Sequence, residues 1–149
     1  MKFWTKDETI AWLASNELGA DSNEPMLNDA WKKTCIDIPT TSLEQAKLSR
    51  AIFSEMKPDD LIVFSLTERT LCSDDEDPVI IERIRLSYGE ERGLDQAPTF
   101  LCGPGESEAA CALLRLFLMF CWDGYLINSR LSICVRFYGH EGCAFVYRR

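Results

Sequence analysis

The stretch that decides the fold runs from Thr99 to Trp122 and reads TFLCGPGESEAACALLRLFLMFCW. Its first four residues are typical of a short buried strand, and the Gly-Pro-Gly after them ends that strand. Ala109 to Trp122 is an apolar run of 14 residues interrupted only by Arg115. A membrane span needs about 20 such residues, so the run predicts a buried helix from about 107 to 123. Gly124 is a suitable residue to end this helix.

Two stretches before this helix predict strands. Leu61 to Leu66 is apolar at nearly every position, which is typical of a central strand. Val79 to Tyr88 alternates between apolar and polar residues, with Arg83 and Arg85 on the polar side. The acidic run Asp74 to Asp77, followed by Pro78, predicts a turn that joins these two strands as a hairpin.

A second hairpin is predicted at the end of the chain, from Leu131 to Tyr138 and from Cys143 to Tyr147. Three helices are predicted at the other end. Thr5 and Glu8 form a capping-box pattern at the first, Met26 to Ile36 follows Pro25 as the second, and Ser42 with Gln45 begins a third that ends before Pro58. These elements predict an α+β domain over residues 1–149. A mainly helical, acidic part (1–58) precedes a mostly antiparallel sheet (59–149) with the apolar helix packed across it.

The charge of the chain is unevenly distributed. Of its 149 residues, 24 are acidic and 16 are basic, so the formal net charge is −8. Residues 1–78 carry 16 acidic and 8 basic side chains, whereas residues 79–149 carry 8 of each. Phosphate contacts supply most of the affinity of nucleic-acid-binding proteins, so this composition argues against nucleic acid as the main partner.

The sequence also indicates the cellular compartment in which the protein is expected. Its N-terminus lacks the apolar core of a signal peptide, and no stretch is long enough to span a membrane. The seven cysteines are odd in number and irregular in spacing, which favours free thiols in the reducing cytoplasm over a disulfide framework. We therefore expect a cytoplasmic protein with no membrane association.

No catalytic, metal or cofactor pattern stands out in the sequence. The only histidine, His140, lies three residues before Cys143, but no second histidine and no CxxC pair complete a zinc set. The Gly103-Pro104-Gly105 turn lacks the GK[ST] of a phosphate-binding loop, and acidic residues follow it. We expect no enzymatic activity and no cofactor.

The arginines suggest one alternative function. If Arg83, Arg85 and Arg136 lie on neighbouring strands, they form an arginine-lined sheet face that can bind carboxylates or phosphates. Our alternative hypothesis is a small-ligand sensor or an enzyme that uses this face. A purely structural role for the same arginines, as ion pairs with the acidic N-terminal part, would also explain their presence.

Charge and size favour a different function. Small acidic α+β proteins often act by binding a basic protein and covering its active surface, as immunity proteins against bacterial toxins and phage-encoded inhibitors do. Our leading hypothesis is a protein of this kind, which binds and inhibits or neutralises another, basic protein. Its candidate contact residues are two tryptophans and the acidic residues of two turns: Trp4, Trp12, Asp59, Asp60, Asp74, Asp75, Glu76 and Asp77.

Overall fold

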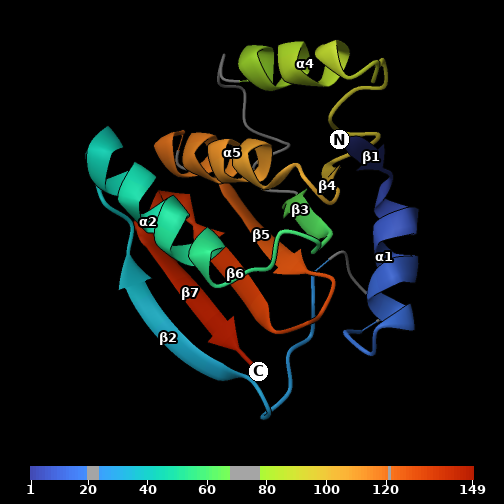
Figure 1. Cartoon of the computed structure of the whole chain (residues 1–149). Coiled ribbons are helices and arrows are strands. Elements are labelled where there is room, and N and C mark those ends of the chain that lie inside the picture. The colour runs from blue at the N-terminus through green and yellow to red at the C-terminus, as the bar shows by residue number, and fades with distance from the viewer. Residues whose placement is uncertain (20–23, 68–77, 121) are drawn as a thin grey trace.

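The computed structural model describes residues 1–19, 24–67, 78–120 and 122–149. In these residues, seven strands form one antiparallel sheet with the order β1-β4-β3-β5-β6-β7-β2, and four α-helices pack against it (Figure 1). The α+β class predicted from the sequence is confirmed. The strands are β1 (Lys2–Trp4), β2 (Lys32–Asp37), β3 (Ile62–Leu66), β4 (Thr99–Cys102), β5 (Asp123–Asn128), β6 (Ile133–Tyr138) and β7 (Cys143–Arg148). The helices are α1 (Lys6–Ser15), α2 (Ser42–Ser54), α4 (Pro78–Ser87) and α5 (Ser107–Met119), and a 3-10 turn covers Gly139–Glu141.

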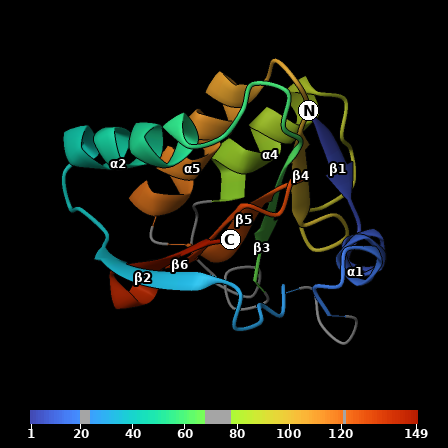
Figure 2. The ribbon, with the colours of Figure 1, turned by 60° about the horizontal axis from the view of Figure 1, so that its bottom comes forward.

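Both faces of the sheet are covered. Helices α2 and α5 lie side by side over one face, and α4 lies on the same side of the sheet as α5 (Figures 1 and 2). On the other face, Leu13 of α1 and Trp31 pack against side chains of β3, β4 and β5 in a second, smaller core. The sheet therefore lies between a large helical layer and a smaller cover made by α1 and the residues around Trp31.

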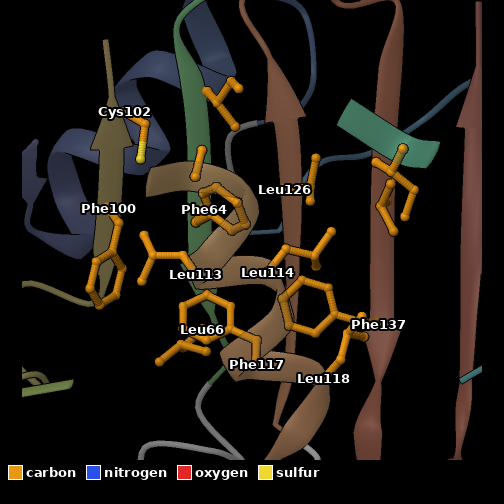
Figure 3. Close-up of a cluster of buried hydrophobic side chains, with 14 of the residues drawn as sticks. Phe64, Leu66, Phe100, Cys102, Leu113, Leu114, Phe117, Leu118, Leu126 and Phe137 are labelled. Carbon is orange, nitrogen blue, oxygen red and sulfur yellow. The ribbon is translucent and has the colours of Figure 1, made fainter. Parts of the chain in front are cut away.

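The main core is centred on an aromatic residue of α5. The ring of Phe117 is fully buried and lies 5.5–5.8 Å, centroid to centroid, from four other rings: Phe64, Phe100, Trp122 and Phe137. Figure 3 shows it among the leucines of the same helix and the inward-facing residues of the sheet. This interlocking of rings from β3, β4, β6 and α5 ties the helical layer to the middle of the sheet.

Some local signals in the sequence predict the structure correctly. The Thr5 hydroxyl accepts a hydrogen bond from the Glu8 backbone N–H at 3.2 Å, and the Glu8 carboxylate accepts one from the Thr5 N–H at 2.7 Å. The capping box at α1 is thus confirmed. The third predicted helix is present as α2, but its N-cap is Thr41, whose hydroxyl accepts from Glu44 N–H, and it ends at Ser54.

The predicted helix over Met26 to Ile36 is wrong. Residues Lys32–Asp37 form β2, which pairs with β7 along its whole length, from Lys32 opposite Arg148 to Asp37 opposite Cys143. Trp31, predicted on the apolar side of that helix, is instead 7% exposed in the smaller core. Burial of this ring and pairing with a strand at the far end of the chain override the local helical signal.

The predicted strand over Val79 to Tyr88 is also wrong, because these residues form α4. The buried residues of this segment are Ile81 and Arg85, four positions apart, which is the spacing of one helix face. The predicted hairpin with residues 61–66 is absent as a result: β3 pairs with β4 on one side and β5 on the other.

The apolar helix is shorter than predicted. Helix α5 ends at Met119, and β5 begins at Asp123, within the range assigned to the helix. Gly124 is a residue of β5 rather than a helix terminator. A Cβ atom there would lie 2.4 Å from the Ser65 carbonyl oxygen and 2.9 Å from the Phe137 ring, so only glycine fits between these neighbours.

Candidate protein-binding surface

Asp60, one of the predicted contact residues, is buried. Its carboxylate accepts hydrogen bonds from Lys57 N–H at 3.0 Å, from Asn128 Nδ2 at 2.9 Å and from Arg130 Nε at 2.6 Å. Its neighbour Asp59 is exposed, and the same arginine donates to it at 2.7 Å. Asp60 therefore anchors the turn before β3 to the β5–β6 connection.

This anchor makes stability depend on pH. Burial raises the pKa of Asp60, but hydrogen bonds from Asn128, Lys57 N–H and Arg130 outweigh it, and the net pKa lies below the ordinary 3.8. The unfolded chain then takes up the proton first, so the stabilisation is complete above about pH 5 and is lost as the pH falls through the folded-state pKa.

We expect Asp60→Asn to lower the free energy of unfolding by about 1–3 kcal/mol at pH 7, because the ionised acceptor of these bonds is lost. The difference in the free energy of unfolding between this variant and the wild type should be smaller at pH 3 than at pH 7. Urea titrations at both pH values measure it, with Asp59→Asn as the matched control, for which we expect less than about 0.5 kcal/mol. Equal effects of the two variants would contradict the anchoring role.

The predicted arginine-lined sheet face does not form. Arg83 and Arg85 lie on α4 rather than on a strand. Arg85 is 1% exposed, and its guanidinium donates to the backbone carbonyls of Ala97, Arg92 and Gly93. Arg83 is exposed on the outer side of the same helix.

Arg136 lies on the opposite face of the sheet. It donates to the Pro25 carbonyl, and its guanidinium carbon is 5.8 Å from the centre of the Tyr147 ring. Arg85, by contrast, stacks over Phe3 and Phe100 on the helical side, at 4.9 and 5.7 Å. The three arginines thus share no surface.

Trp4 and Trp12 are brought together, with ring centroids 6.1 Å apart. Both are partly buried and pack against the smaller core. The remaining predicted contact residues, Asp74, Asp75, Glu76 and Asp77, lie outside the described residues.

His140 lies on the 3-10 turn and Cys143 at the start of β7. The Cys143 thiol donates to the Glu141 carboxylate at 4.0 Å, and His140 is exposed on the 3-10 turn. Burial and the neighbouring Glu141 both raise the pKa of Cys143, which disfavours the reactive thiolate.

A surface that the sequence analysis missed lies on α4. Four large apolar side chains of this short helix and the residue after it are exposed: Val79 by 51%, Ile80 by 39%, Leu86 by 59% and Tyr88 by 46%. Several large apolar side chains exposed on one short element are typical of a protein contact. Figure 1 shows α4 on the same side of the sheet as α5, and its buried residue Arg85 packs over Phe3 of β1 and Phe100 of β4.

Two hollows flank the C-terminal half of α4. One, of about 230 Å³, is acidic and lies between the helix and the loop after it. The other, of about 220 Å³, lies between α4 and α5 and is mostly apolar. Leu86 lines the acidic hollow with three glutamates and two arginines: Glu82, Glu90, Glu91, Arg85 and Arg92. Tyr88 lines the apolar one with Ile84, Leu113 and Leu116.

The carboxylates of the acidic hollow differ in their partners. Arg92 donates to Glu90 at 2.6 and 2.8 Å, and this hydrogen bonding lowers the pKa of Glu90 to about 2. Within the described residues, Glu82 and Glu91 form no ion pair. We define the α4 surface as Val79, Ile80, Glu82, Leu86, Tyr88 and Glu91.

The strand predicted over residues 79–88 did not indicate this surface. Ile80, Ile84 and Tyr88 satisfy both the two-residue period of a strand and the four-residue spacing of a helix. The pair Ile81 and Arg85 could have indicated the helix, had a buried arginine been considered.

A third hollow, of about 420 Å³, lies between α2 and α5. It is lined by Ser49, Arg50, Glu108, Cys111 and Arg115, together with two alanines. Arg115 donates to the Ser42 hydroxyl. The charged lining of this third hollow is two arginines and one glutamate, whereas that of the acidic hollow is three glutamates and two arginines, so the two linings have net charges of opposite sign.

Comparison of the chain with family models, with curated proteins and with solved structures finds no match. Among the described helices, none combines the length and the apolar character that a membrane span requires. Across the same residues, no three histidine, cysteine, aspartate or glutamate side chains gather closely enough to hold a metal ion.

Proposed function

We propose that this protein binds a basic protein through the α4 surface and acts by covering part of that partner, as an inhibitor does. The observation that supports this proposal is the set of exposed apolar residues on α4 and just after it, beside an acidic hollow. Both features lie on one helix and the loop that follows it. No enzymatic step is part of the proposal.

The apolar residues would supply affinity. Leu86 and Tyr88 lie on the last turn of α4 and just after it, each beside a hollow that an incoming side chain can enter. Burying a leucine side chain stabilises a complex by about 1.5–3 kcal/mol. Large apolar residues that fill such hollows at the centre of an interface usually carry most of the binding energy.

The carboxylates would select the partner. Glu82 and Glu91 line the same hollow as Leu86, so the aliphatic part of an arginine or lysine can lie on the leucine while its charged end meets the carboxylates. The acidic run Asp74–Asp77 directly precedes α4 in the sequence, and the whole chain carries a net charge of −8. Such charge attracts a basic partner and accelerates its association.

Selection from a library of random peptides tests this proposal without a known partner. We expect peptides selected on the wild-type protein to combine arginine or lysine with a large apolar residue. The double variant Glu82→Lys/Glu91→Lys should bind them with an association rate at least about tenfold lower at low salt. Leu86→Ala should raise the Kd about tenfold, mainly through faster dissociation.

Two controls make the outcome specific. Asp29→Lys and Met26→Ala change an exposed acidic and an exposed apolar residue away from α4, and we expect them to bind as the wild type does. If the selected peptides are acidic and depend on Arg50 and Arg115, the groove between α2 and α5 is the binding site and the proposal is wrong. Binding that is insensitive to Leu86→Ala overturns it as well.

A further inference from the structure

The two edges of the sheet differ sharply. At one edge, β1 has only three residues, whereas the other edge is β2 with six. Strand β2 is paired with β7 in unbroken register, and all of its residues except Ile36 are exposed. Figure 2 shows β2 running along the margin of the molecule. A long, regular and exposed edge is a site at which another strand can pair.

The hydrogen bonding to β7 determines which residues of β2 face outward. Ile38 N–H donates to the Gly142 carbonyl at 2.8 Å, so the even-numbered residues of β2 direct their backbone groups toward β7. The odd-numbered residues Lys33, Cys35 and Asp37 direct theirs toward the open edge. Their side chains all lie on the sheet face opposite α2 and α5.

We propose that β2 pairs antiparallel with β2 of a second copy of this chain, about a twofold axis at Cys35. This inference concerns the opposite side of the molecule from α4 and is independent of the proposed function (Figure 1). Twofold symmetry about an axis normal to the sheet requires that each residue face one of the same parity. With the axis at Cys35, the outward-facing backbone groups of Lys33, Cys35 and Asp37 all find partners.

The charges favour the same register. Lys33 faces Asp37 of the second copy, and Asp37 faces its Lys33, so each dimer has two opposite-charge pairs directly across the strands. Lys33 Nζ lies 3.7 Å from the centre of the Phe145 ring, on the face that carries Asp37. Thr34 faces Ile36 on the other face.

Neighbouring registers are less favourable. With the axis at Thr34, Lys33 faces Cys35 and Asp37 faces the buried Trp31 of the second copy, so neither charge meets its opposite. With the axis at Ile36, Lys33 faces Pro39, which has no N–H to donate. Only the axis at Cys35 satisfies both the backbone groups and the charges.

Charge reversal tests the dimer and its register together. Sedimentation of the wild-type protein over about 1–200 μM should show a concentration-dependent dimer, since an interface made by one strand pair is small and weak. Lys33→Asp and Asp37→Lys should each raise the dimer Kd about tenfold or more, because two attractive pairs become repulsive. When the two variants are mixed, every pair is attractive again, so a dimer of one copy of each should form.

The control is Lys32→Asp, which makes the same change of charge at the adjacent position on the other face and should leave the Kd within about threefold. A short bis-maleimide should link two wild-type chains through Cys35, which is exposed, and Cys35→Ser should abolish the link. A wild-type protein that stays monomeric throughout the range overturns the proposal. A mixture of the charge variants that fails to associate overturns the register.

Discussion

Phe117→Ala is expected to lower the free energy of unfolding by about 3–5 kcal/mol, the range for truncating a fully buried aromatic side chain. The ring of Phe117 contacts aromatic rings from three strands and from the residue before β5, so its loss leaves a cavity at the junction of α5 and the sheet. Surrounding rings cannot close this cavity without leaving their own contacts. Since domains of this size are stable by about 5–15 kcal/mol, a large part of the total is lost.

Urea denaturation followed by tryptophan fluorescence measures this change, because Trp122 lies 5.5 Å from Phe117. The matched control is Met119→Ala on the same helix, where the side chain is 43% exposed and we expect less than about 1 kcal/mol. A loss below about 1 kcal/mol for Phe117→Ala would show that the centre of the core lies elsewhere.

Arg85→Ala is expected to have a comparable effect, about 3–5 kcal/mol, for a different reason. The guanidinium donates to the carbonyls of Arg92 and Gly93 at 2.9 and 3.1 Å and to that of Ala97, and so holds the loop between α4 and β4. Hydrogen bonds from a charged donor contribute about 1.5–3 kcal/mol each, offset in part by the cost of removing the guanidinium from water. Its loss leaves the buried Ala97 carbonyl without this donor.

Two further variants separate hydrogen bonding from packing. Arg85→Met keeps an unbranched apolar stem over Phe3 but removes every donor, so we expect it to retain most of the destabilisation. Arg83→Ala, two positions earlier and exposed, should stay within about 0.5 kcal/mol of the wild type. Hydrogen exchange should show faster exchange of the amides of Gln96 and Ala97, which bond to the Gly93 carbonyl. An Arg85→Met variant as stable as the wild type would contradict this account.

The burial of Asp60 and Arg85 is not predictable from local sequence patterns. The sequence predicts Asp60 as a contact residue for a basic partner and Arg85 as part of a ligand-binding sheet face, although charged side chains are buried when they find partners. Both are buried because the folded chain supplies hydrogen-bonding partners: Asn128 and Arg130, distant in the sequence, for Asp60, and carbonyls of the loop that follows α4 for Arg85. No sequence pattern around either residue indicates these bonds.

The sequence by itself determined the features that depend on neighbouring residues. The capping box of α1 needs only Thr5 and Glu8, the strand at Thr99 to Cys102 is bounded by its own Gly-Pro-Gly turn, and the last hairpin joins strands adjacent in the chain. The α+β class follows from such signals. Each acts over a few residues, so the local sequence contains all of its physical cause.

Only the tertiary structure decided the rest. Residues 26–36 carry helical signals, yet Lys32–Asp37 is a strand because β7 provides hydrogen-bonding partners along its whole length. Residues 79–88 fit either period, and the main core, the sheet residues Phe3 and Phe100 and the loop after α4 together bury Ile81 and Arg85 on one side of a helix. The α4 surface exists because residues 79–88 form a helix, and the open edge of β2 exists because Lys32–Asp37 forms a strand. Strand pairing and side-chain burial between distant segments outweigh local propensities of a few tenths of a kcal/mol per residue. Which distant segments come into contact cannot be read from a single sequence.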